Sequence, residues 1–221
     1  MTVLHVSTSG SDSAEGSAEA PFRTVNRAAA AAQPGDTVLV HSGVYREWVN
    51  PPRGGTPDAP ITFQPAVGPD GRFEAVTISG AEVVTDWHPH PGAEGRVWVT
   101  RVPNVVFGER NPYAERIGGD WFFDQVNTWH TGEVYLDGKS MYEALTRGGV
   151  EHPEVTPDSF DPEGSLLTWY CEVGDDVTTI WANFGAAVPA EHEIEINVRA
   201  FVLWPATTGI DHITVRGFTL T

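Results

Sequence analysis

Apolar and polar residues alternate along short stretches of this chain, as they do in half-buried β-strands. Runs of this kind are TVLHVS, DTVLVHSGVYRE, PITFQP and VTISGAE, with turn residues between them. The last ten residues repeat the pattern, with apolar side chains at Ile213, Val215, Phe218 and Leu220. The step from Val38 to Thr62, about 24 residues, is close to one coil of a parallel solenoid, in which each coil buries its apolar side against its neighbours.

One stretch has the pattern of a helix instead. The run VNRAAAAAQ places Val25 and three alanines on one face, Thr24 is a suitable N-cap, and Pro34 with Gly35 ends the run. A narrow alanine face suits close packing against a flat surface. We therefore expect a short helix that caps the open end of the solenoid.

From about Trp87 the predicted strands become longer. They lie in VWVTRV, GEVYLDGKSMYEA, SLLTWYCEV, TTIWANF and EIEINV, and Asp137 with Gly138 predicts a tight hairpin turn. Several longer strand patterns separated by turns are typical of a β-sandwich. We predict an all-β protein in three parts: 1–86 with the cap and first coils, 87–198 as an inserted sandwich, and 199–221 as the return to the solenoid.

Composition agrees with β structure, because glycine (23), proline (17) and tryptophan (8) are plentiful. The chain has 13 basic and 30 acidic residues, a formal net charge of −17. That balance argues against nucleic acid and anionic membranes as partners, because both require clustered lysine and arginine. It would also repel a polyuronate in the absence of bridging calcium, and we see no dense carboxylate loop for calcium. Neutral sugars remain suitable partners.

The single cysteine, Cys171, lies in the apolar run LLTWYCEV, so we expect a buried and unreactive thiol. The first residues, MTVLHVSTSG, lack the basic and apolar parts of a signal peptide, and no apolar run is long enough to cross a membrane. The expected location is therefore cytoplasmic.

Motifs for nucleotide binding and for a serine nucleophile are absent. His88 and His90 flank a proline without a third ligand at a useful spacing, so we expect no metal site and no cofactor. Residues 53–58, RGGTPD, are rich in glycine, proline and aspartate, so we expect a turn with a structural role. For Glu47, beside Arg46, a surface ion pair is the expected role.

Aromatic residues are dense between Gly118 and Tyr135. Sugar rings present apolar C–H faces and hydroxyl edges, so flat aromatics beside carboxylates suit them chemically. Packing within a sandwich core is the alternative role for the same residues. Our candidates for sugar contact are Trp129, His130 and Trp121.

The first 80 or so residues resemble the N-terminal segment of right-handed parallel β-helix proteins of the pectate-lyase-like superfamily. The resemblance rests on the order of the helix, PGDTV, GVYRE, GG and API. Over nearly the whole chain, NPYAERIGGDWFF, HTGEVYLDGKSMYE, TTIWANF, EINVR and GIDHITVRGFTL resemble glycoside hydrolase family 120, β-xylosidases with a sandwich inserted into a β-helix.

This resemblance implies a right-handed parallel β-helix, a retaining mechanism and a neutral xylo-oligosaccharide substrate. No position here matches the catalytic aspartate and glutamate of the family, so we expect the N-terminal part of a longer enzyme, inactive alone, with the catalytic carboxylates beyond residue 221. A homo-oligomer is a further expectation. Two alternatives stay open: a carbohydrate-binding β-helix module without chemistry, and a polysaccharide lyase, which would require calcium and a basic residue such as Lys139, the chain's single lysine.

Overall fold

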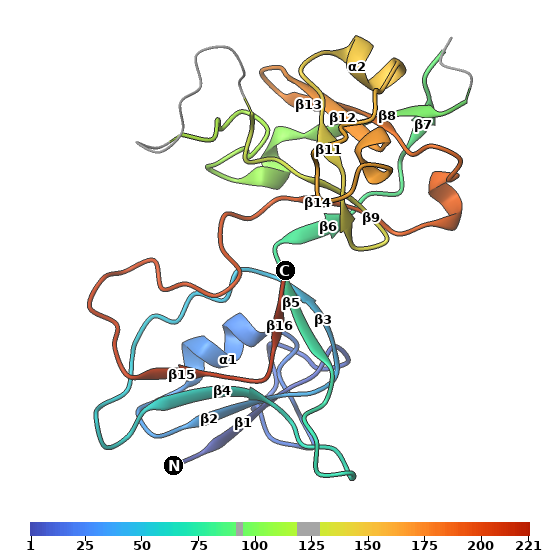
Figure 1. Ribbon diagram of the computed structural model, residues 1–221. Coiled ribbons are helices and arrows are strands. Elements are labelled where there is room, and N and C mark those ends of the chain that lie inside the picture. Colours follow the sequence, from blue (N-terminus) through green and yellow to red (C-terminus); the bar gives the residue numbers. More distant parts are fainter. Residues whose placement is uncertain (92–94, 119–128) are drawn as a thin grey trace. The chain divides into compact units, whose positions relative to one another are not determined.

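The computed structural model describes residues 1–91, 95–118 and 129–221. The chain divides into two compact units (Figure 1). The first unit comprises Met1–Gly80 and Phe201–Thr221, and the second comprises Ala81–Ala200. Strands dominate both units, as expected for an all-β protein.

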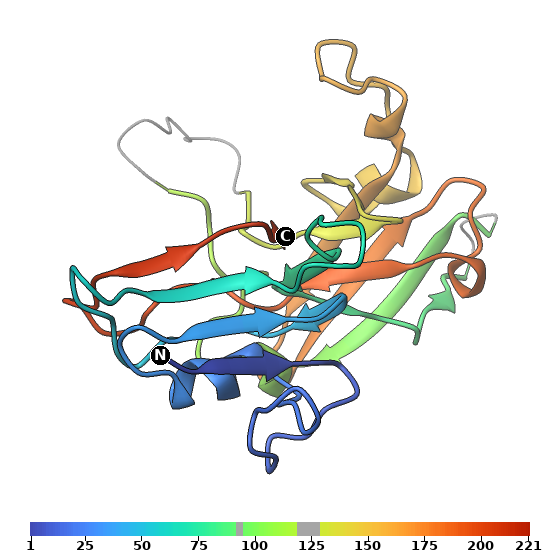
Figure 2. The same cartoon turned by 90° about the horizontal axis from the view of Figure 1, so that it is seen from below.

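The first unit contains two parallel sheets. One has the order β1 (Val3–Val6), β2 (Thr37–Val40), β4 (Ile61–Pro65) and β15 (Ile213–Val215), and Figure 2 shows these strands side by side. The other has the order β16 (Thr219–Leu220), β5 (Val76–Ser79) and β3 (Gly43–Arg46). The chain passes from the first sheet to the second three times, through β2 to β3, β4 to β5 and β15 to β16. Each pass therefore adds one strand to each sheet.

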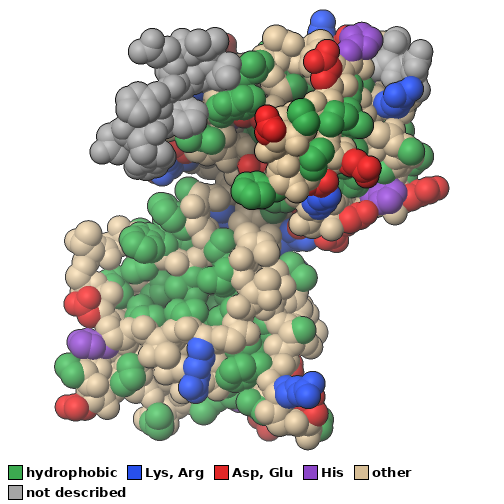
Figure 3. All heavy atoms as spheres, in the orientation of Figure 1, with side chains coloured by type: hydrophobic (Ala, Val, Ile, Leu, Met, Phe, Trp, Pro, Cys, Tyr) green, Lys and Arg blue, Asp and Glu red, His purple; other side chains and the backbone are tan. Residues whose placement is uncertain are grey.

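The core of the first unit follows from alternation within these strands. In β2 and β4 every second side chain is almost fully buried, namely Val38, Val40, Ile61 and Phe63. Helix α1 (Val25–Ala31) packs its valine and alanine face against β1 and β2, as the pattern predicted. The last strands are less covered, since Val215 and Leu220 are exposed, and apolar side chains gather on the face shown in Figure 3.

Side chains from outside the helix satisfy both ends of α1. Thr24 Oγ1 accepts a hydrogen bond from Arg27 N at 3.1 Å, which confirms the predicted N-cap. The Glu47 carboxylate accepts from the N–H groups of Val25 and Asn26 at 2.9 and 2.7 Å. Arg53 Nη1 donates to two carbonyl groups at the other end of the helix. Glu47 thus binds a helix N-terminus, a contact that its place beside Arg46 did not indicate.

Gly54 and Gly55 lie where two segments of the first unit approach closely. Gly55 N donates to Asp211 O at 3.1 Å. A Cβ atom at Gly54 would lie 1.9 Å from Asp211 O, well inside van der Waals contact. The double glycine of RGGTPD is therefore required by the backbone of a segment more than 150 residues later in the sequence.

His5 and His41 form a stacked pair in the first unit. Their ring centroids are 5.4 Å apart, and His5 Nδ1 lies 3.1 Å from His41 Nε2. His41 Nδ1 also faces Glu74 Oε1 at 3.5 Å. Burial lowers the pKa of His5 below its usual 6.5, His41 lowers this pKa further, and Glu19 opposes the shift.

This pair predicts a pH-dependent stability of the first unit. Because the pKa of His5 is lower in the folded chain, the unfolded chain binds more protons once the pH falls below about 6.5. The free energy of unfolding should therefore be highest above that pH and decrease on acidification. Urea unfolding between about pH 7.5 and 5.5 measures this, and His5→Gln should give a shallower decrease than the wild type. Identical slopes for the two proteins would contradict the role of His5.

The second unit contains two sheets that share one core. One sheet has the order β11 (Tyr142–Glu143), β12 (Thr168–Val173), β13 (Val177–Asn183), β8 (Val97–Pro103) and β7 (His88–Pro89). The other has the order β10 (Lys139–Ser140), β9 (Val134–Leu136), β14 (Ile194–Asn197) and β6 (Ala81–Val83). All pairs are antiparallel except β11 with β12. Side chains of both sheets meet in the core, including Val134, Trp169, Ile180 and Ile194.

Short helices complete this unit. Helix α2 (Arg147–Glu151) lies against β12 and β13, where Val150 and Trp181 form a smaller apolar cluster. The 3-10 turns are η1 (Asn104–Phe107), η2 (Gly164–Leu166) and η3 (Pro189–Glu191). Among the residues that the structure describes, no helix combines the length and apolar character needed to cross a membrane.

Two local predictions are confirmed in the second unit. Asp137 (φ 51°) and Gly138 (φ 75°) form the two-residue turn between β9 and β10, with Leu136 opposite Lys139. Cys171 is buried, and burial raises the pKa of its thiol to about 12, with smaller contributions from nearby glutamates. Such a thiol carries almost no thiolate at neutral pH, so it is unreactive.

Candidate functional site

Trp129 and His130 lie on extended backbone in the second unit. A neighbouring segment holds them there, because Ile117 N donates to Trp129 O and Thr131 N donates to Glu115 O, both at 2.8 Å. A single β-bridge between Arg116 and His130 joins the same two segments. The backbone that carries both candidate side chains is therefore fixed by hydrogen bonds on one side.

Glu143, at the end of β11, fixes His130 from another side. Its Oε2 accepts from the backbone N of His130 at 2.8 Å, and its Oε1 lies 2.5 Å from His130 Nδ1. The side chains of His130 and Glu143 are only 22% and 11% exposed, so solvent weakens this pair little. Both carboxylate oxygens of Glu143 are thus engaged with His130.

A pocket of about 460 Å³ opens beside this pair. Its lining comes from the segment before β9, from β10 to β11, and from the segment before η2. These residues are Trp129, Glu133, Lys139, Ser140, Met141, Tyr142, Glu143 and Asp161. Aromatic and apolar groups come from Trp129, Met141 and Tyr142, and the remaining side chains are polar or charged. A volume of several hundred cubic ångströms is typical of sites for small molecules.

Glu133 is the second carboxylate of the pocket. Ser140 Oγ donates to its Oε2 at 2.5 Å, and its backbone N donates to Asn197 Oδ1 at 2.7 Å. Burial raises the pKa of the Glu133 carboxyl and the charge of Glu143 raises it further, while the hydrogen bond from Ser140 opposes both. Glu133 therefore takes up a proton more readily than an exposed glutamate and can then donate as well as accept a hydrogen bond.

Lys139 and Asp161 form an ion pair at the pocket. Each partner favours the charged form of the other, so the pKa of Asp161 is lowered and that of Lys139 is raised. Both side chains are partly exposed, so the pair adds little to stability. It does place an ammonium donor and a carboxylate acceptor where a bound molecule can reach them.

These groups together suit a neutral polyhydroxylated ligand. An indole can cover an apolar ring face, while carboxylates, a hydroxyl and an ammonium group can bind hydroxyl groups at its edge. Within residues 1–91, 95–118 and 129–221, no cluster of three histidine, cysteine or carboxylate side chains is placed to hold a metal ion. The pocket thus has the features of a binding site for a small polar molecule.

The structure describes two of the three residues predicted from the sequence, and one of these two lines the pocket. Trp129 lines the pocket and His130 lies behind it, bound to Glu143. Trp121 lies outside the described residues. Other residues of the pocket were not predicted from the sequence, among them Glu143, Lys139, Tyr142 and Asp161. The Asp137-Gly138 turn gave a signal for Lys139 alone, since it predicts that Lys139 lies opposite Leu136 in a hairpin.

Comparison with known families places the chain in one of them. The insertion-domain model of glycoside hydrolase 120 matches residues 84–196, just over half of the chain. A second model, for a protein family of unknown function (DUF1565), matches residues 8–50. The first match covers the second unit almost completely, and the other lies within the first unit.

Similar proteins extend this result. The structure of XylC in complex with xylose matches 99% of the chain with 40% sequence identity and a TM-score of 0.92. The uncharacterized protein YwoF of Bacillus subtilis (strain 168) is 39% identical over 88 residues, which are 40% of this chain and 18% of that protein. The chain spans 35% of the length of XylC. On the insertion-domain match and the likeness to XylC, the chain belongs to glycoside hydrolase family 120.

Proposed function

We propose that the chain is the N-terminal part of a retaining glycoside hydrolase that acts on xylo-oligosaccharides as a β-xylosidase. The observation that carries the proposal is the match to XylC, a protein solved with xylose, over 99% of this chain. The catalytic carboxylates lie beyond residue 221 in this proposal. One of them attacks the anomeric carbon, and the other protonates the leaving oxygen and then activates water.

The proposal includes a specific architecture. The first unit forms the first coils of a right-handed parallel β-helix, with α1 as its cap, and the second unit is a β-sandwich inserted at about residues 87–198. Three passes that each add one strand to two parallel sheets support the coil arrangement. Two sheets with a shared core support the sandwich.

The pocket beside Trp129 contacts the sugar in this proposal. Trp129 covers an apolar face of the ring, Glu133 and Lys139 bind hydroxyl groups, and His130 is held in place by Glu143. Supporting features are the aromatic wall, the polar groups around it and the hydrogen bonds that fix Trp129 and His130 before any ligand arrives. Trp121 is proposed as a third contact residue.

Replacing Trp129 with alanine tests the sugar contact. We expect Trp129→Ala to weaken binding of xylobiose about tenfold, or about 1.4 kcal/mol, because the indole face is lost. Isothermal titration of the 221-residue chain measures binding, and kcat/KM for xylobiose in the longer enzyme measures its consequence. Phe160→Ala is the matched control, since Phe160 is a fully exposed aromatic residue of the same unit.

Two results would contradict the proposal. An unchanged dissociation constant and an unchanged kcat/KM in Trp129→Ala would remove Trp129 from the site. Hydrolysis of xylobiose by the 221-residue chain alone, at the rate of a complete glycosidase, would show that the catalytic carboxylates lie within it.

A further inference from the structure

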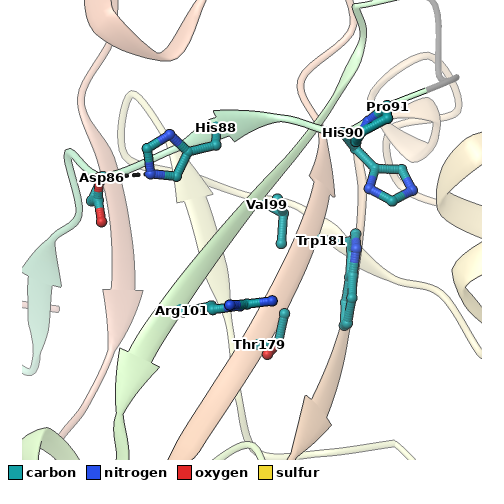
Figure 4. Close-up of a pocket in the computed structure, with 8 residues that line it drawn as sticks. All are labelled: Asp86, His88, His90, Pro91, Val99, Arg101, Thr179 and Trp181. Carbon is teal, nitrogen blue, oxygen red and sulfur yellow. Dashed lines mark ion pairs between the residues drawn. The ribbon is translucent and has the colours of Figure 1, made fainter.

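A second pocket lies on the face of the five-stranded sheet that points away from the core of the second unit. Its volume is about 410 Å³. Figure 4 shows its eight lining residues, Asp86, His88, His90, Pro91, Val99, Arg101, Thr179 and Trp181. It shares no residue with the pocket beside Trp129. His88 and His90, which sequence analysis found unsuited to a metal site, both line it.

The strand register explains why these side chains meet. Val99 of β8 lies opposite His88 of β7 on one side and Trp181 of β13 on the other. Two residues along, Arg101 lies opposite Thr179. Residues directly opposite each other in antiparallel strands point to the same face, and so do residues two apart within a strand.

Apolar and aromatic side chains form the base of the pocket. Val99 lies near its centre in Figure 4, and the Trp181 ring stands beside it. Trp181 is held by Tyr170, with ring centroids 6.0 Å apart, and by the Arg147 guanidinium 5.8 Å from its ring centroid. Trp181 is only 8% exposed, so it offers a small apolar part of its ring beside Val99, which suits contact with C–H groups of a sugar.

The polar groups around this base differ from those of the first pocket. His88 Nε2 pairs with Asp86 at 3.0 Å, and His90 Nε2 faces Glu151 at 3.5 Å. The Arg101 side chain is exposed and makes no hydrogen bond or ion pair with any described residue. It is thus an uncommitted guanidinium in a concave site, in a chain whose net charge is −17. Guanidinium groups bind carboxylates through two parallel hydrogen bonds.

We propose that this pocket binds a uronic acid unit, the carboxylate-bearing sugar of an acidic xylo-oligosaccharide. This inference rests on the proposed function, which makes xylo-oligosaccharides the ligands of the protein. Arg101 binds the carboxylate, His88 and His90 bind hydroxyl groups, and Val99 and Trp181 contact the ring. A pocket of this volume admits one such unit. The net negative charge of the chain would repel a polyuronate, but Arg101 provides a local positive charge for a single carboxylate.

The test compares two small ligands on the isotope-labelled 221-residue chain. Methyl β-glucuronide and methyl β-xyloside differ only in the carboxylate on the ring. We expect the glucuronide to shift the NMR signals of Trp181 and of β8, and the xyloside to shift those of Trp129. Arg101→Gln should weaken glucuronide binding about tenfold, because a hydrogen-bonded charge is lost. Arg101→Lys should restore part of it, since an ammonium group cannot bind both oxygens in the same plane.

Arg72→Gln is the control, since Arg72 is an exposed arginine of the first unit, and it should leave glucuronide binding unchanged. Glucuronide binding that is equal in wild type and Arg101→Gln would overturn the inference. So would equal affinities for glucuronide, acetate and inorganic phosphate, because the pocket would then bind any anion. Failure of the proposed function gives a different result, namely no response to xyloside at Trp129 while glucuronide still shifts Trp181.

Discussion

Replacing Gly54 with alanine is expected to destabilise the first unit by about 3 kcal/mol. A Cβ atom at this position would lie 1.9 Å from the carbonyl oxygen of Asp211 and 2.8 Å from its backbone N. Both atoms belong to the backbone, so no side-chain rotation can relieve the contact. One of the two segments must move, which also strains the hydrogen bond from Gly55 N to Asp211 O. Urea unfolding measures the loss as a lower transition midpoint.

Gly118→Ala is the control for Gly54→Ala. It shows how replacing a glycine with alanine changes stability where no close backbone contact is involved. A Cβ atom at Gly118 would meet no atom of the described residues within 4 Å, so that variant should unfold at the wild-type urea concentration or slightly above it. A Gly54→Ala protein as stable as Gly118→Ala would show that residues 53–55 and 211 do not approach as described.

Replacing Glu143 with alanine is expected to have the second-largest effect, because it changes both stability and binding. The variant leaves the backbone N–H and the imidazole of His130 without their acceptor in a half-buried place. We expect a loss of about 2 kcal/mol in the free energy of unfolding. Xylobiose binding should weaken as well. Glu143 holds His130, and loss of this contact frees the adjacent Trp129 to move. Urea unfolding and isothermal titration measure the two effects.

Glu143→Gln and Glu172→Ala are informative comparisons. The glutamine keeps an acceptor for the N–H of His130, so it should retain part of the stability. Glu172 is exposed on β12 of the same unit, and its replacement should change neither quantity. If Glu143→Ala binds xylobiose as the wild type does, positioning of His130 has no part in sugar recognition.

Features set by neighbouring residues were predicted from the sequence. The helix that begins after Thr24 and the turn at Asp137-Gly138 both rest on contacts within a few residues, and both are present. The longer strand patterns of the second unit likewise correspond to β8, β12, β13 and β14. Alternation and turn chemistry act locally, so they can be recognised without knowledge of the fold.

Other features depend on segments that are distant in sequence. The run VTISGAE has one strand pattern, but Gly80 divides it between β5, which pairs in the first unit, and β6, which pairs with β14 in the second. Glu47 reaches the N-terminus of α1 from a position more than 20 residues later. Trp129 likewise lies in one pocket with Glu143, Lys139 and Asp161 because the fold brings separate segments together. Residue type and spacing do not determine which side chains a fold brings together.

The arrangement of β15 and β16 also affects how the first unit can form. β15 pairs with β4 and β16 pairs with β5, although the whole second unit lies between β5 and β15 in sequence. Joining the ends of a flexible loop costs about 0.6 kcal/mol more for each doubling of its length, so a long unfolded insertion opposes this pairing. The second unit is one continuous segment, and once folded it removes most of that conformational freedom. Addition of β15 and β16 to the first unit is therefore coupled to folding of the second unit through chain entropy.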